Sequence, residues 1–92
     1  MADHLEETVA TVHDHLEATE ELPLEPGANR WIAEAQAVVA DLKTGTPDDD
    51  TVDRRLATVV DLLSEVDSTG HPDADDHVAA ARRRAEAAID RI

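Results

Sequence analysis

The chain lacks cysteine, phenylalanine and tyrosine, and its 92 residues include one tryptophan and three glycines. Without cysteine, neither a disulfide framework nor a cysteine-ligated metal site can form. No apolar run approaches the roughly 18 residues of a membrane-spanning helix, and the acidic N-terminus does not resemble a secretory signal. Three scattered glycines make no phosphate-binding loop, and no serine has a glycine elbow or an obvious histidine partner. We therefore expect a cytoplasmic, single-domain protein over residues 1–92.

Positive charge is also scarce, with 8 basic residues against 22 acidic ones and a formal net charge of −14. Such a charge is typical of disorder, but the periodic apolar residues argue against disorder here. The composition instead favours a protein adapted to concentrated salt, where the Debye length falls to about 3 Å. A nucleic-acid binder needs a basic stripe, whereas Arg82, Arg83 and Arg84 stand among acids and spread around a helix. We expect neither nucleic acid nor a membrane as a partner.

Apolar residues recur at spacings of three and four in four segments, which predicts helices over about residues 2–21, 28–44, 47–67 and 72–91. Connections of about three to six residues favour antiparallel neighbours, so we predict an all-α, four-helix, up-down antiparallel bundle. The apolar arc of the first helix is about 60° wide, which predicts either a peripheral helix or a seam between two helices. That of the third helix is about 160° wide, which predicts a central helix with the other three packed around it.

Residues that commonly begin or end helices mark the predicted helix ends. Thr46 is the predicted N-cap of the third helix, Pro47 its first helical residue, and Gly70 its left-handed stop. Gly45 should end the second helix, and Pro72 should begin the fourth.

The residues predicted to carry the core, and any interaction built on it, lie on the second and third helices. They are Trp31, Val38, Leu42, Leu56, Val59 and Leu63. Many remaining apolar positions hold alanine, which buries little area, and a homodimer would enlarge so lean a core. Ala33, Ala37 and Ala40 line the opposite side of the second helix, where they serve either as a dimer face or as good helix formers.

Two groups of residues could hold a metal ion. His13 and Glu17 lie one helical turn apart and could supply two ligands, or they belong to a solvated acidic face. Asp73, Asp76 and His77 gather with His71 at the start of the fourth helix, where helix capping and the helix dipole already account for the acids. His15 and His4 repeat along the first helix about 16 Å apart, so we expect them to border its apolar stripe rather than share a metal. We predict no metal and no cofactor.

An enzymatic alternative rests on paired carboxylates. Glu17 and Glu20 resemble the Glu-x-x-Glu magnesium motif of all-α nucleotide pyrophosphatases, and Asp73 and Asp76 match its second acidic pair loosely. The resemblance implies a metal-dependent hydrolase. Among 22 acidic residues such pairs also arise by chance.

Residues 60–82, with the sequence VDLLSEVDSTGHPDADDHVAAAR, are similar to small acidic all-helical proteins of halophilic archaea, a family of unknown function. The resemblance implies an all-helical fold and carries no catalytic residue. We predict a non-catalytic helical bundle that acts through self-association as a homodimer or through a protein partner, with the hydrolase as the alternative.

Overall fold

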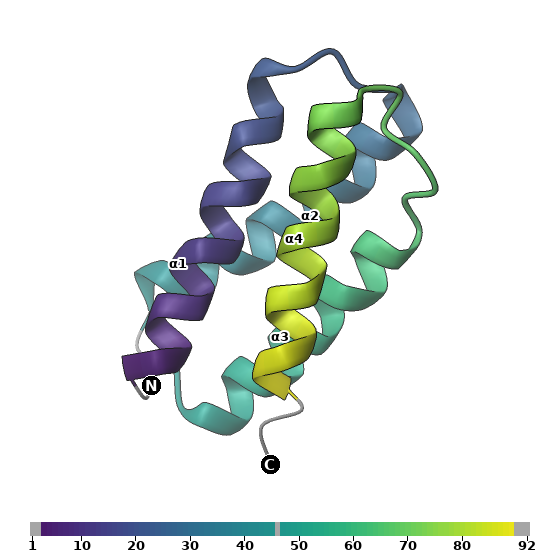
Figure 1. Cartoon of the computed structure of the whole chain (residues 1–92). Helices are drawn as coiled ribbons and strands as arrows, with labels where there is room; N and C mark the ends of the chain where they lie inside the picture. The colour runs from purple at the N-terminus through teal and green to yellow at the C-terminus, as the bar shows by residue number, and fades with distance from the viewer. Residues whose placement is uncertain (1–2, 46, 90–92) are drawn as a thin grey trace.

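The computed structural model describes residues 3–45 and 47–89. It contains α1 (Asp3–Ala18) with a 3₁₀ extension (Thr19–Glu21), α2 (Pro26–Thr44), α3 (Asp49–Ser64) and α4 (Pro72–Ile89). Each helix packs against the next in the chain, and α4 closes the bundle against α1 (Figure 1). The predicted all-α up-down bundle is confirmed, and the described residues include no strand.

The core is built from one apolar stripe on each helix. All four stripe residues of α1 are at most 1% exposed, so of its two predicted alternatives the peripheral helix is wrong. The helix packs on both α2 and α4. The prediction of a central α3 is also wrong, because its main neighbours are α2 and α4, and none of the described helices occupies the middle of the bundle. The larger fully buried side chains are Leu5, Val9, Val12, Leu16, Ile32, Val39, Val52, Leu56, Val59 and Leu63.

The stripe of α2 is rotated from the predicted one. Ile32, Val39 and Leu42 face the core and are at most 3% exposed, whereas Trp31 and Val38 are only partly buried at the edge of the stripe. Tryptophan is large and is rarely buried completely.

Several helix ends differ from the predicted ones. The predicted N-cap, Thr46, lies outside the described residues. Asp48 caps α3 by accepting a 2.8 Å hydrogen bond from the backbone N–H of Thr51, so Pro47 precedes the helix instead of starting it. The helix ends at Ser64, and Gly70, with φ +82°, lies in the following turn rather than at its end.

The starts of α2 and α4 fit the preference of proline for the first position of a helix. Pro26 is the first residue of α2, which therefore begins two residues before the predicted position, and Pro72 begins α4 as predicted. Gly45 follows the last residue of α2 with φ −94°, in an extended conformation.

Candidate functional site

A pair of histidines joins α1 to α4 near one end of the bundle. The Nδ1 atoms of His15 and His77 lie 3.0 Å apart in a hydrogen bond, and their ring centroids are 5.3 Å apart. Both side chains are partly buried. Because the two helices are antiparallel neighbours, the second half of α1 faces the first half of α4 (Figure 1). This arrangement brings together two residues that are 62 positions apart in the sequence.

The environment of His15 disfavours its charged form. Burial lowers the pKa of its imidazole, and the positive charges of His77, Arg84 and Arg83 act in the same direction, whereas Asp14 opposes them. A neutral imidazole can accept a hydrogen bond on one nitrogen, and an imidazolium cannot. The surroundings therefore favour a neutral His15, which can either accept the hydrogen bond with His77 or donate it.

Sequence reasoning missed this pair. It placed His15 at the border of the α1 stripe and grouped His77 with the neighbouring acids of its own helix. The up-down topology contained the missing information, since the end of the first helix and the start of the fourth lie at the same end of such a bundle.

His13 lies on the opposite flank of α1 from His15. Its Nδ1 atom is 3.3 Å from Oε2 of Glu17, and the two side chains are 15% and 58% exposed. Ligand atoms of His13, Asp14 and Glu17 lie within 4.8 Å of one another, the one such group of three among the described residues. All three belong to consecutive turns of one helix, the carboxylates are exposed, and no described residue of a neighbouring helix adds a ligand. The spacing of four residues along one helix accounts for the contact of His13 with Glu17, so we assign no metal ligand here.

The four carboxylates of the hydrolase alternative are not brought together. Glu20 turns toward α2 and accepts a 2.7 Å hydrogen bond from Nε2 of Gln36, while Glu17 lies beside His13. Asp73 and Asp76 are exposed on α4 and do not join Glu17 in a group of potential metal ligands within the described part of the chain. The geometry gives no magnesium centre built from these residues.

The acid at the start of α4 that does form close contacts is Asp75, which sequence reasoning did not single out. Its Oδ1 atom accepts 2.8 Å hydrogen bonds from the backbone N–H and the hydroxyl of Thr69, which is fully buried. These two bonds lower the pKa of the Asp75 carboxyl. The contact fixes the turn between α3 and α4.

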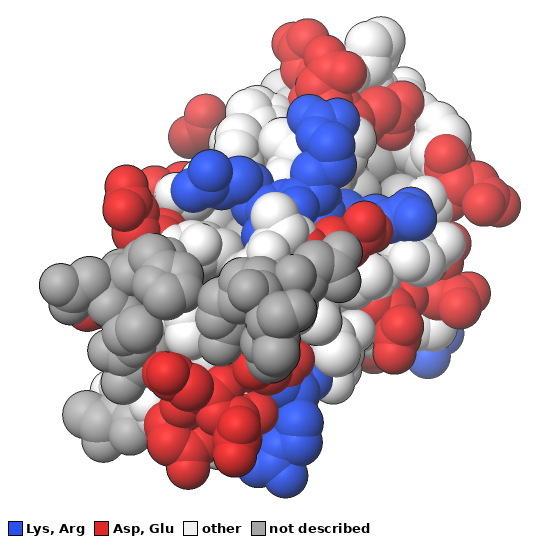
Figure 2. Space-filling model, turned by 60° about the horizontal axis from the view of Figure 1, so that its bottom comes forward, with Lys and Arg blue, Asp and Glu red and all other residues white. Residues whose placement is uncertain are grey.

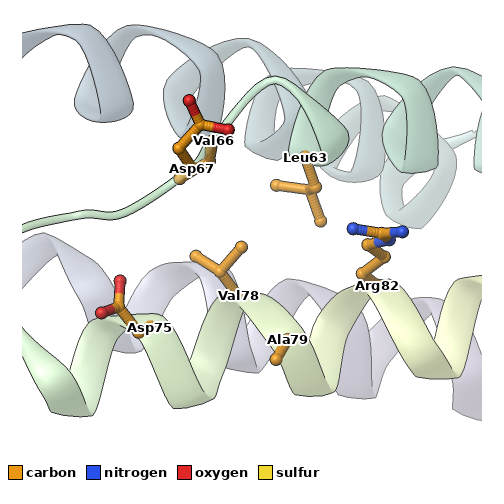
Figure 3. A pocket seen from close by; sticks show the side chains of 7 residues that line it. All are labelled: Leu63, Val66, Asp67, Asp75, Val78, Ala79 and Arg82. Atoms are coloured by element: carbon orange, nitrogen blue, oxygen red, sulfur yellow. The ribbon is translucent and has the colours of Figure 1, made fainter.

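Two grooves border α3. The α3–α4 groove has an apolar floor of Leu63, Val66 and Val78, with Asp75 toward one end and Arg82 at the other (Figure 3). Both of these charged side chains are already engaged, Arg82 by a 2.8 Å ion pair with Glu86 and Asp75 by Thr69. Asp67, the third charged residue of the lining, is exposed.

The second groove, here called the Trp31 groove, lies between the start of α2 and the end of α3 and has a volume of about 340 Å³. Its lining residues are Glu25, Gly27, Ala28, Trp31, Glu65, Val66, Asp67 and Ser68. The guanidinium carbon of Arg30 lies 5.4 Å from the centre of the Trp31 ring. A groove in which Trp31 and Val66 lie among three carboxylates and a serine is thus open to solvent.

The surface as a whole is acidic, as the net charge of −14 requires. On one face, basic side chains gather in a band across the middle and acidic ones surround them (Figure 2). None of the described helices is long and apolar enough to cross a membrane.

Fold and surface together define a small acidic four-helix bundle. The chain belongs to a family described as a domain of unknown function, DUF8152, whose model matches residues 3–92. No curated protein and no solved structure matches the chain.

Proposed function

We propose that this chain is a non-catalytic binding module of a salt-adapted cytoplasm, which engages a protein partner through the Trp31 groove. The observation that carries the proposal is the position of the single aromatic residue. Trp31 is partly exposed and lines an open groove instead of filling the core. Tryptophan is enriched among the residues that dominate binding energy at protein interfaces.

The charges around the groove favour one kind of partner. Glu25, Glu65 and Asp67 line it together with Trp31 and Val66, and no basic residue is among the described residues that line it. A segment with an arginine or lysine beside an apolar side chain complements this surface.

A second copy of the chain is the first partner to test. The core of the chain buries little apolar area, since the buried positions of α4 are alanines apart from Val78. Ala33 and Ala37 are exposed on the far side of α2, and Ala40 is partly buried. A homodimer would cover this apolar surface and add to the buried area.

The proposal is tested in molar KCl with the whole chain. Light scattering over a range of concentrations reports self-association, and anisotropy of a labelled peptide of alternating arginine and leucine reports binding in the groove. We expect binding to weaken at least tenfold in a variant with Glu65→Gln and Asp67→Asn.

The matched control carries Asp41→Asn and Asp61→Asn, which remove two exposed charges outside the groove. It should bind like the wild type. The proposal would be contradicted if the protein is a monomer that does not bind the peptide. It would also be contradicted if both double variants weaken peptide binding to the same extent.

A further inference from the structure

We propose that the hydrogen bond between His15 and His77 is a pH-sensitive latch that holds α1 against α4. It closes the bundle at neutral pH and opens as the two imidazoles take up protons. This role is independent of the Trp31 groove, because the latch lies on the α1–α4 side and the groove lies between α2 and α3.

The geometry is that of a hydrogen bond rather than a chelate. The ring centroids are 5.3 Å apart and the Nδ1 atoms are 3.0 Å apart. The difference is about twice the distance from the centre of an imidazole ring to one of its nitrogens. Both nitrogens therefore lie close to the line that joins the ring centres, and each points at the other. Two imidazoles that share a metal ion must instead point at a common third position, with an angle between their bonds.

A hydrogen bond of this kind depends on the number of protons. One Nδ1 carries the hydrogen and the other accepts it, so at least one ring must be neutral. A first added proton can be placed on the outer nitrogen of the donor ring without breaking the bond. A second proton fills the accepting nitrogen, removes the acceptor and places two like charges in contact.

The surroundings strengthen the response to acid. Burial and the nearby Arg83 and Arg84 oppose charge on His15, and Asp14 is the one neighbouring group that favours it. These effects lower the pKa of His15 in the folded protein below its ordinary value of 6.5. The unfolded chain therefore takes up protons first as the pH falls, and stability decreases from about pH 6.5 down to the lowered pKa of the folded state.

The latch matters because α4 has little apolar area with which to hold α1. Four of its five buried residues are alanines, namely Ala74, Ala81, Ala85 and Ala88. A buried alanine contributes much less transfer free energy than a leucine or a valine. A polar contact across this interface thus accounts for a larger share of its stability than it would between leucine-rich helices.

The experiment compares the wild type with His15→Asn at constant molar KCl. The asparagine amide places a hydrogen-bonding group close to the position of Nδ1 but does not titrate. The equilibrium unfolding constant of the wild type, divided by that of the variant, should rise by up to tenfold per pH unit below about pH 6.5. The protection factors of the amides in residues 8–18 and 72–80, which account for the slower intrinsic exchange in acid, should fall over the same range in the wild type only.

His71→Asn is the matched control, because His71 accepts a 3.2 Å hydrogen bond from the backbone of Asp73 and takes no part in the latch. It should keep the pH dependence of the wild type. Parallel pH profiles of the wild type and His15→Asn would overturn the proposal. If His15→Asn does not fold, NMR titration of the wild-type histidines decides: a pKa of His15 at or above 6.5 contradicts the latch, and a lower one supports it.

Discussion

At the residue scale, two glycines with different surroundings provide a sharp comparison. Gly70 has φ +82°, and an added Cβ would lie 3.0 Å from Cγ of Glu25. The left-handed conformation costs a residue with a side chain about 1–2 kcal/mol, so Gly70→Ala should lower the free energy of unfolding by that amount. Urea denaturation at neutral pH measures the change.

Gly27→Ala is the opposite case. Gly27 lies in the first turn of α2, where an added Cβ would meet nothing within 4 Å, and alanine is the better helix former. We expect a gain of up to about 1 kcal/mol in the free energy of unfolding. If Gly70→Ala and Gly27→Ala lower the free energy of unfolding equally, the left-handed conformation of Gly70 is not the cause of its loss.

The hydrogen bonds of Asp75 predict a response to acid. Its pKa is lowered in the folded state, so the stabilisation is complete above the ordinary value of 3.8 and is lost as the pH falls through the lowered value. Asp75→Asn should flatten the dependence of the unfolding midpoint on pH below about 4, which thermal unfolding followed by circular dichroism can measure.

The exposed neighbour Asp76 supplies the control, since Asp76→Asn changes the same charge on the same helix. If the unfolding midpoint falls as steeply with pH in Asp75→Asn as in Asp76→Asn, the contact of Asp75 with Thr69 is not the source of the acid dependence.

At the scale of the helices, α1 tests how far an apolar stripe predicts packing. Leu16 of α1 and Leu56 of α3 are both fully buried. Leu16→Ala and Leu56→Ala should each lower the free energy of unfolding by about 2–5 kcal/mol, as expected for leucines in a closed core. Chemical denaturation measures both, with the exposed Thr58→Ala as a control that should change it by less than about 0.5 kcal/mol. A loss for Leu16→Ala near that of the control would restore the interpretation of α1 as peripheral.

The period of the apolar residues predicted where the helices lie, because one buried stripe per helix is enough to produce it. The width of the stripe did not predict the neighbours. In a bundle whose helices each have two main neighbours, a narrow stripe such as that of α1 can be buried completely, and partly buried residues such as Val60 and Leu62 can widen the stripe of α3 without making it central.

The candidate site was harder to predict than the fold. His13 and Glu17 could be paired from their spacing within one helix, and the structure places them 3.3 Å apart. The contact of His15 with His77 needed the relative position of two helices and the rotation of each about its axis. The same rotation places Trp31 beside the core, and its groove depends on where α3 ends.

At the scale of the whole molecule, a net charge of −14 is carried on the surface of a bundle whose described backbone extends over only 35 × 24 × 17 Å. At 0.01 M salt the Debye length is about 30 Å, so every acidic side chain repels nearly every other one. At 1 M it falls to about 3 Å, and repulsion acts only between charges in contact. The free energy of unfolding should therefore rise steeply as KCl increases from the millimolar to the molar range, since the compact state relieves its self-repulsion.

A charge-reduced variant separates this repulsion from general effects of salt on burial. Glu7→Gln, Glu21→Gln, Asp41→Asn and Asp61→Asn remove four exposed negative charges distributed over the bundle. This variant should be more stable than the wild type in dilute salt and should gain less from added KCl. A second variant that exchanges glutamate and aspartate at the same four positions keeps the charge and should follow the wild type. If all three proteins gain equally from KCl, the salt acts by strengthening apolar burial, and relief of repulsion within the acidic surface is not the cause.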